Sequence, residues 1–185
     1  RDSGNPDRKY RFGWELVEPQ PGVLVGINTG LPSVLVQEAL AERRVTELQD
    51  YDHVRPEVKY GRENSRIDLL LTGRGRPDCY VEIKNVTLVE DGIALFPDAV
   101  STRAAKHLRE LEHVVAGGGR GVILFCVQRP DAAEVRPADH IDPDYGKALR
   151  HALENGVEAV ALGARVAPDG VTLETRLEVV CPNQP

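Results

Sequence analysis

The chain has 185 residues, of which 41% are hydrophobic and 28% are charged, and its formal net charge is −6. These values describe an ordinary soluble globular protein, long enough for one good core or for one domain plus a fragment. We expect no membrane span and no secretion signal, because the sequence has neither a run of about 18 apolar residues nor an apolar leader. The acidic balance also argues against a protein coated for nucleic-acid binding, although a binding surface can be local.

Cysteine usage and the first residue add two expectations. Cys79, Cys126 and Cys181 are widely separated, which is neither a disulfide framework nor a zinc pattern and suits a reducing cytoplasm. The sequence contains no methionine and begins with Arg1, so we expect the natural start to lie upstream.

Two strands are predicted first. Aromatic and apolar residues alternate with polar or small ones over residues 10–18, which predicts a strand with one buried face. The apolar members of this face are Tyr10, Phe12, Trp14 and Leu16. A turn rich in Pro and Gly and a strand over residues 23–27 complete a hairpin, which we interpret as the remnant of a small β unit.

A helix is predicted next, up to about Arg44. Thr29 and Ser33 are its candidate N-caps, and Glu38 lies within it.

Three consecutive antiparallel strands are then predicted, over residues 55–60, 66–71 and 79–86. The second carries one acid, Asp68, among residues that are otherwise typical of a core. A lone buried carboxylate is costly unless something pairs with it, and Lys84 or a bound cation could be that partner.

The third strand places an acid and an amine on one face. Its alternation directs Tyr80, Glu82 and Lys84 to one side of the sheet, and the residues between them to the other. A turn-rich connection joins this strand to the one before it, so we expect a hairpin on which Asp68, Glu82 and Lys84 converge.

A helix over residues 99–116 begins the second half of the chain. Its apolar stripe, with helical spacing, consists of Val100, Ala104, Leu108, Leu111 and Val115. Residues 121–128 are apolar throughout, which predicts a central strand covered on both faces. The remaining predicted elements are a loop over 129–143, a helix over 144–154 and a hairpin of strands over 157–166 and 171–180.

The order strand, strand, strand, helix, strand, with acids on the second and third strands, resembles the core of the PD-(D/E)XK nuclease-like superfamily. Longer phrases are similar to the sugar fermentation stimulation protein A family of bacteria and archaea, over a span of roughly residues 10–180. These phrases occupy residues 61–68, 80–88, 96–100, 106–111 and 141–146.

The resemblance implies an α/β fold, with a mixed central sheet, flanking helices and a restriction-endonuclease-like core over residues 29–185. Residues 1–28 would be the remnant of an N-terminal OB-like β barrel. The resemblance also implies a cytoplasmic, DNA-binding protein.

The acids point to metal chemistry. Carboxylates are the hard oxygen ligands that Mg²⁺ or Mn²⁺ prefers, and Asp68 and Glu82 fit that role. By resemblance, the backbone carbonyl of Ile83 would be another ligand, and Lys84 would orient the attacking water or stabilise developing negative charge.

A further acid from the helix before the first strand often completes such sites in this superfamily. Glu38 is the candidate here, with Glu57 in reserve. The alternative for Glu38 is an ordinary solvated helix residue.

Two groups of basic residues are candidates for nucleic-acid binding. On the helix after the third strand, Arg103, Lys106 and His107 form a basic face, which is either a solvated surface or a track for phosphates. Around the entrance to the site, the candidates are Lys59, Arg62 and Arg66.

Two functions remain open at this point. One is a divalent-metal-dependent nuclease acting on DNA, with Asp68, Glu82 and Lys84 catalytic. The other is a non-catalytic, DNA-binding transcriptional regulator of sugar (maltose) metabolism that uses a nuclease-like fold. In that case the acids would be kept for structure, as part of an ion-pair network that supports the sheet, or for metal-assisted binding. The oligomeric state, including a homodimer, is also open.

Overall fold

The computed structural model describes residues 2, 4–7, 9–61 and 65–182. The helices of this part are α1 (Pro32–Ala41), the short 3₁₀ helix η1 (Thr46–Leu48), α2 (Thr102–Ala116) and α3 (Pro143–Glu154). The strands are β1 (Leu16–Gln20), β2 (Val23–Gly26), β3 (His53–Tyr60), β4 (Ser65–Thr72), β5 (Cys79–Val86), β6 (Leu88–Glu90), β7 (Ile93–Phe96), β8 (Arg120–Val127), β9 (Glu134–Pro137), β10 (Glu158–Ala167) and β11 (Gly170–Val179). Within these ranges, no helix is both long and apolar enough to span a membrane.

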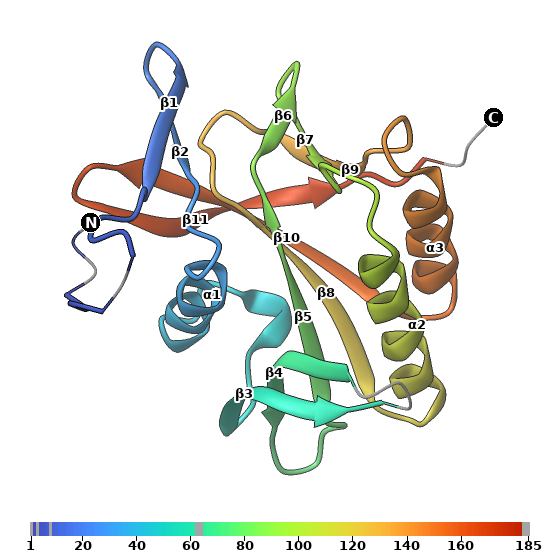
Figure 1. Cartoon of the computed structure of the whole chain (residues 1–185). Coiled ribbons are helices and arrows are strands. Elements are labelled where there is room, and N and C mark those ends of the chain that lie inside the picture. The colour runs from blue at the N-terminus through green and yellow to red at the C-terminus, as the bar shows by residue number, and fades with distance from the viewer. Residues whose placement is uncertain (1, 3, 8, 62–64, 183–185) are drawn as a thin grey trace.

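A mixed sheet of nine strands organises the molecule, in the order β3-β4-β5-β8-β10-β11-β9-β7-β6 (Figure 1). Its centre is the parallel set β5, β8 and β10, and β3 and β4 extend it as antiparallel strands. β1 and β2 form a separate two-stranded antiparallel sheet. The predicted α/β fold with a mixed central sheet and flanking helices is confirmed.

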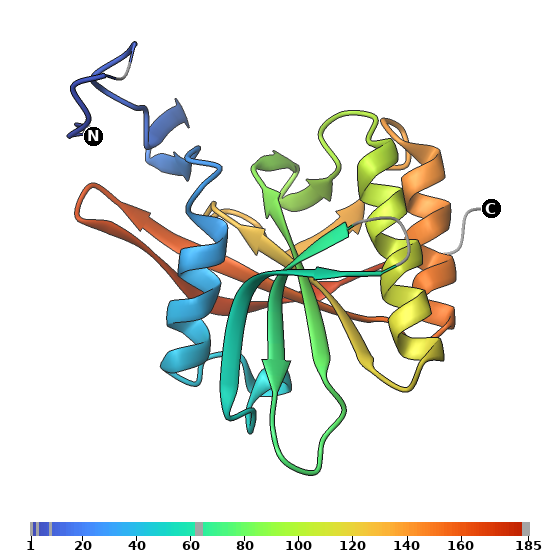
Figure 2. The same cartoon turned by 60° about the horizontal axis from the view of Figure 1, so that its bottom comes forward.

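Helices cover the two faces of the sheet (Figure 2). α1 packs on one face through Leu35, Val36 and Ala39. α2 and α3 lie side by side on the other face, where they bury Leu108 and Leu149. β8 is buried along almost its whole length, because both of its faces are covered, as the apolar run predicts.

The pairing of β4 with β5 stops halfway along both strands. The register runs from Leu71↔Cys79 to Leu69↔Val81 and ends there, while β4 stays paired with β3 up to Tyr60↔Ser65. β3 and β4 therefore bend away together, and the second half of β5 has an open edge where Asp68 lies.

The N-terminal prediction is wrong in part. β1 begins at Leu16, and the earlier aromatic residues are exposed: Tyr10 by 68%, Phe12 by 65% and Trp14 by 82%. Alternation buries one face of a strand only when another element packs on it, and of this face Leu16 packs against the core while the three aromatic rings stay largely exposed. The division of the chain at residue 28 stays a prediction.

Two helix starts also differ from the sequence prediction. The N-cap of α1 is Leu31, without a side-chain cap, so neither Thr29 nor Ser33 caps it. α2 begins at Thr102 with the Ser101 hydroxyl as its cap, and Val100 lies outside the helix with 73% of its surface exposed. Pro32 begins α1 with a residue that has no N–H, so one fewer backbone donor is left without an intrahelical partner there.

The sequence prediction missed the short strands β6, β7 and β9. β9 lies within the predicted loop over residues 129–143 and pairs with β7 and β11, which are distant in the sequence. Strands of three or four residues have too little periodicity to predict, because long-range pairing defines them.

Candidate active site

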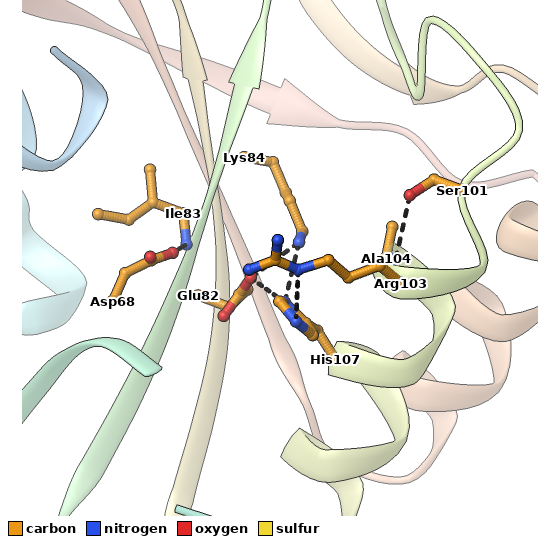
Figure 3. A network of polar contacts seen from close by, with 8 residues as sticks. All are labelled: Asp68, Glu82, Ile83, Lys84, Ser101, Arg103, Ala104 and His107. Carbon is orange, nitrogen blue, oxygen red and sulfur yellow. Dashed lines mark hydrogen bonds and ion pairs between the residues drawn. The ribbon is translucent and has the colours of Figure 1, made fainter. Parts of the chain in front are cut away.

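Glu82 and Lys84 of β5 point toward α2 (Figure 3). Their side chains are only 4% and 10% exposed, and the Lys84 Nζ donates to Glu82 Oε1 at 2.8 Å. The period of two along β5 places them on one face, as the alternation predicts.

His107 reaches the same carboxylate from α2. Its Nδ1 forms a hydrogen bond with Glu82 Oε1 and lies 3.3 Å from Lys84 Nζ. The sequence predicts His107 on an exposed basic face, but the structure buries it, with 7% of its surface exposed. Its contact with nucleic acid stays a prediction, and its described contacts point inward.

The second carboxylate oxygen of Glu82 is bare. Oε2 is buried, and it has no hydrogen-bond partner among the described residues. A buried anionic oxygen without a donor is costly, and such groups require an explanation such as an ion. Oε1 therefore takes the protein's donors, and Oε2 is available to a ligand.

Asp68 lies at the open edge of β5. Its Oδ2 accepts the backbone N–H of Ile83 at 2.6 Å, in place of the ladder bonds that end at Leu69. Lys84 was one expected partner of Asp68, but its Nζ donates to Glu82 and lies close to His107. Burial and the charge of Glu82 raise the pKa of Asp68 to about 6, against the opposing effect of the Ile83 hydrogen bond.

The environment of Glu82 lowers its pKa, in contrast to that of Asp68. Burial acts to raise its pKa, but the hydrogen bond from His107 and the charge of Lys84 outweigh burial and hold the pKa below its ordinary value. Glu82 is therefore ionised at neutral pH beside a carboxyl that gives up its proton less easily. This pairing of two acids in different environments is common at functional sites.

Tyr60 is a residue of the site that the sequence reasoning did not single out. Its hydroxyl is buried without a hydrogen-bond partner among the described residues. Burial and the charges of Glu82, Glu110 and Asp68 raise its pKa above the usual value, which places the hydroxyl near these acids. Only the bend of β3 and β4 brings Tyr60 here, and local sequence carries no signal for it.

The oxygen atoms at this edge suit a hard divalent cation. The C=O of a strand residue points to the same neighbouring strand as its N–H, so the Ile83 carbonyl faces the open edge beside Asp68. No group of three or more His, Cys, Asp and Glu side chains in the described ranges gathers around one point. Two carboxylates with one carbonyl and waters are nevertheless sufficient for Mg²⁺ or Mn²⁺.

The two further acid candidates lie in different places. Glu38 is on the exposed side of α1, where it lines a groove with Val34 and the turn that joins β10 to β11. Glu57 lies opposite Asp68, between the register pairs on either side, and its charge contributes to the raised pKa of Asp68. The structure therefore brings the reserve candidate, rather than Glu38, to Asp68.

Three of the basic candidates are exposed on the elements that carry or face the acids. Lys59 and Arg66 are exposed on β3 and β4, and Arg66 forms an ion pair with Glu57 at 3.4 Å. Arg103 is exposed on α2 and donates from Nε to His107 Nε2 at 3.4 Å, while Lys106 is half-buried. Arg62 lies outside the described residues.

Comparison with known proteins gives consistent matches. Residues 30–170 match the family model described as the sugar fermentation stimulation protein RE domain. Proteins named sugar fermentation stimulation protein homolog from Geobacter metallireducens and Pelobacter propionicus are each 58% identical over 179 residues, covering 96% of this chain and 76% of theirs. The solved structure of Pyrococcus furiosus SfsA in complex with Ca²⁺ is similar with a TM-score of 0.80 and 28% identity, covering 87% of this chain and 69% of that one.

Proposed function

The chain belongs to the sugar fermentation stimulation protein family, as the sequence predicted, and from this premise we propose that it binds DNA and hydrolyses phosphodiester bonds with a divalent cation. Asp68, Glu82 and the Ile83 carbonyl would hold Mg²⁺ or Mn²⁺. The relative from Pyrococcus furiosus was solved with Ca²⁺, another hard cation that prefers oxygen ligands.

The observation that carries the proposal is that Glu82 Oε2 has no hydrogen-bond donor among the described residues. This oxygen is buried next to the open edge where the Asp68 carboxylate lies. A purely structural ion-pair network would be expected to satisfy both oxygens of a buried carboxylate. A cation at this edge would satisfy Oε2 and reduce the repulsion between the two acids.

Each side chain then has a separate task. When bound, the cation neutralises the scissile phosphate and lowers the pKa of a coordinated water. Glu82 and Asp68 fix its position on rigid sheet. Lys84, held at 2.8 Å from Glu82 Oε1, places a positive charge where negative charge develops on the phosphate or where the attacking water is oriented.

Exposed basic residues support the choice of DNA as substrate. Lys59, Arg66 and Arg103 lie on elements that flank the acids, so a phosphate backbone along them would pass the site. Phosphate contacts of this kind position a nucleic acid without reading its sequence. The local basic groups would offset the net charge of −6 only at this face.

The free cysteines support a proposed cytoplasmic location. Cys79, Cys126 and Cys181 are all free, which agrees with the reducing cytoplasm. A homodimer and an OB-like barrel that includes residues 1–28 stay predictions.

A nuclease assay tests the proposal. The protein is incubated with plasmid and with single-stranded DNA, in the presence of Mg²⁺ or Mn²⁺ and in the presence of a chelator. We expect cleavage that needs the cation and that disappears in Glu82→Gln, because one ligand charge is lost. Glu178→Gln, the same change at an exposed position of β11, is the matched control and should cleave like the wild type.

Binding without cleavage, under every cation tested, would contradict the nuclease proposal and favour the non-catalytic DNA-binding regulator. Cleavage that survives in Glu82→Gln would show that the activity arises elsewhere.

A further inference from the structure

The two oxygens of Glu82 have opposite environments, and His107 is part of the reason. Oε1 receives both the Lys84 ammonium, at 2.8 Å, and the His107 Nδ1. Oε2 receives no donor from the described residues. A carboxylate whose one oxygen is held by two donors cannot rotate freely, so the direction of the other oxygen is fixed.

The hydrogen bonds of His107 define its tautomer. Arg103 Nε lies 3.4 Å from His107 Nε2, and a guanidinium can only donate, so Nε2 carries the lone pair. The proton of a neutral ring is then on Nδ1, which donates it to Glu82 Oε1. Lys84 Nζ, which also only donates, is merely close to Nδ1. Both ring nitrogens are therefore engaged, and His107 is not available as a metal ligand.

We propose that His107 is a positioning residue, which holds Glu82 Oε1 so that Oε2 faces the cation. This inference rests on the cation site of the proposed function and adds a residue to it. Partners that orient a metal ligand through a hydrogen bond typically change metal affinity by about 10–100-fold when they are removed. Arg103 acts one step further out, because it keeps the proton of His107 on Nδ1.

A packing role for His107 makes a different prediction. His107 lies beside Leu108 and Ala104 on the face of α2 that is buried against the sheet. If it only filled space there, an apolar replacement of similar size would serve the site as well as a polar one. The two explanations therefore separate by whether the replacement keeps a donor at the position of Nδ1.

Two variants make this comparison. His107→Asn places its amide nitrogen close to the position of Nδ1, whereas His107→Leu has a similar branched shape and no donor. Calorimetric titration with Ca²⁺ measures the affinity, and melting without a cation checks that each variant is folded. We expect His107→Leu to lose about 10–100-fold in affinity and His107→Asn to stay much closer to the wild type.

Equal affinities of the Asn and Leu variants, whether both are reduced or both are unchanged, would overturn the positioning role. If His107→Leu does not fold, His107→Ala takes its place in the same comparison. Wild-type protein that binds no Ca²⁺ or Mn²⁺ would instead defeat the proposed function, and the inference that rests on it as well. The two failures are therefore distinguishable in the same titration.

Discussion

Two clusters of charged side chains on the same sheet differ in whether both oxygens of their central carboxylate have hydrogen-bond partners. At the start of β8 and β10, Arg120 contacts Glu158 with two hydrogen bonds, from Nε to Oε1 at 2.5 Å and from a terminal nitrogen to Oε2 at 2.7 Å. Arg120 also donates to the Glu47 carbonyl and the Tyr51 hydroxyl. At the open edge of β5, Glu82 has both donors on one oxygen and none from the described residues on the other.

Burial makes this contrast informative. The Glu158 side chain is 42% exposed, so water could satisfy it, yet both of its oxygens are paired. The Glu82 side chain is 4% exposed and keeps a bare oxygen, where an unpaired charge costs most. The satisfied cluster is explained by stability alone, whereas the unsatisfied one agrees with the proposed cation site.

Removing the amine of the β5 cluster should have the largest effect. Lys84→Met should reduce the rate of cation-dependent cleavage by about 100-fold or more, because a charge positioned at the reacting phosphate is lost. Single-turnover cleavage with Mn²⁺ measures this change. Lys147→Met, on the exposed side of α3, is the control and should be unaffected. A Lys84→Met variant that cleaves at the wild-type rate would remove Lys84 from the mechanism.

Removing Arg120 from the satisfied cluster should reduce the stability of the fold and leave cation binding unchanged. Arg120→Met removes a bidentate ion pair with Glu158, which is partly exposed. We therefore expect the free energy of unfolding to fall by about 2 kcal/mol. Urea denaturation measures the loss. Cation affinity should not change, since Arg120 pairs with Cys79 in the parallel register, three residues before Glu82, and its hydrogen bonds go to Glu158, Glu47 and Tyr51. Loss of cation binding in a folded Arg120→Met variant would erase the distinction between the clusters.

Neutralising Asp68 should stabilise the cation-free protein above pH 6. Its pKa is about 6 in the folded protein and 3.8 ordinarily, so between these values only the folded state holds the proton. The stability from this group is fully present below about pH 4 and is lost as the pH rises through 6. Asp68→Asn is neutral throughout and still accepts the Ile83 N–H. We expect a gain of roughly 1–2 kcal/mol at pH 8 and none at pH 4.

The outcome of the Asp68 experiment is measured by denaturation with a chelator present at both pH values. A gain in the free energy of unfolding that is equal at pH 8 and pH 4 would mean that folding does not raise the pKa of Asp68.

The exposed basic residues should have the smallest effect. Replacing Arg103 and Lys106 by Ala should flatten the log-log dependence of DNA affinity on salt by about 0.9 for each phosphate that the protein no longer neutralises. Fluorescence anisotropy at several salt concentrations measures the slope. Lys147→Ala serves as the control. An unchanged slope in the double variant would place the DNA elsewhere.

The sequence predicts the part of the site that depends on short-range periodicity. The alternation along β5 places Glu82 and Lys84 on one face, and the structure has them there, because the period of a strand is local. The family membership predicted from longer phrases is confirmed as well.

Contacts set by packing could not be predicted. His107 meets Glu82 across 25 positions of sequence, and Tyr60 reaches the acids only because β3 and β4 leave β5 together. Glu38 is a residue that the sequence placed at the site, because it lies on a helix before the first strand. The structure places it on the exposed side of α1. Helical or strand periodicity says which face a residue is on, but not what packs against that face.

Cation binding by Glu82 is the central claim, and melting with and without Mn²⁺ tests it most directly. A cation that binds only the folded state raises the melting temperature by mass action. The account predicts a rise for the wild type and for Glu158→Gln, and none for Glu82→Gln, which should be less stable without the cation because the buried Lys84 ammonium loses its charged partner. A wild type that does not respond to millimolar Mn²⁺ or Mg²⁺, or a Glu82→Gln variant that responds equally, would contradict it.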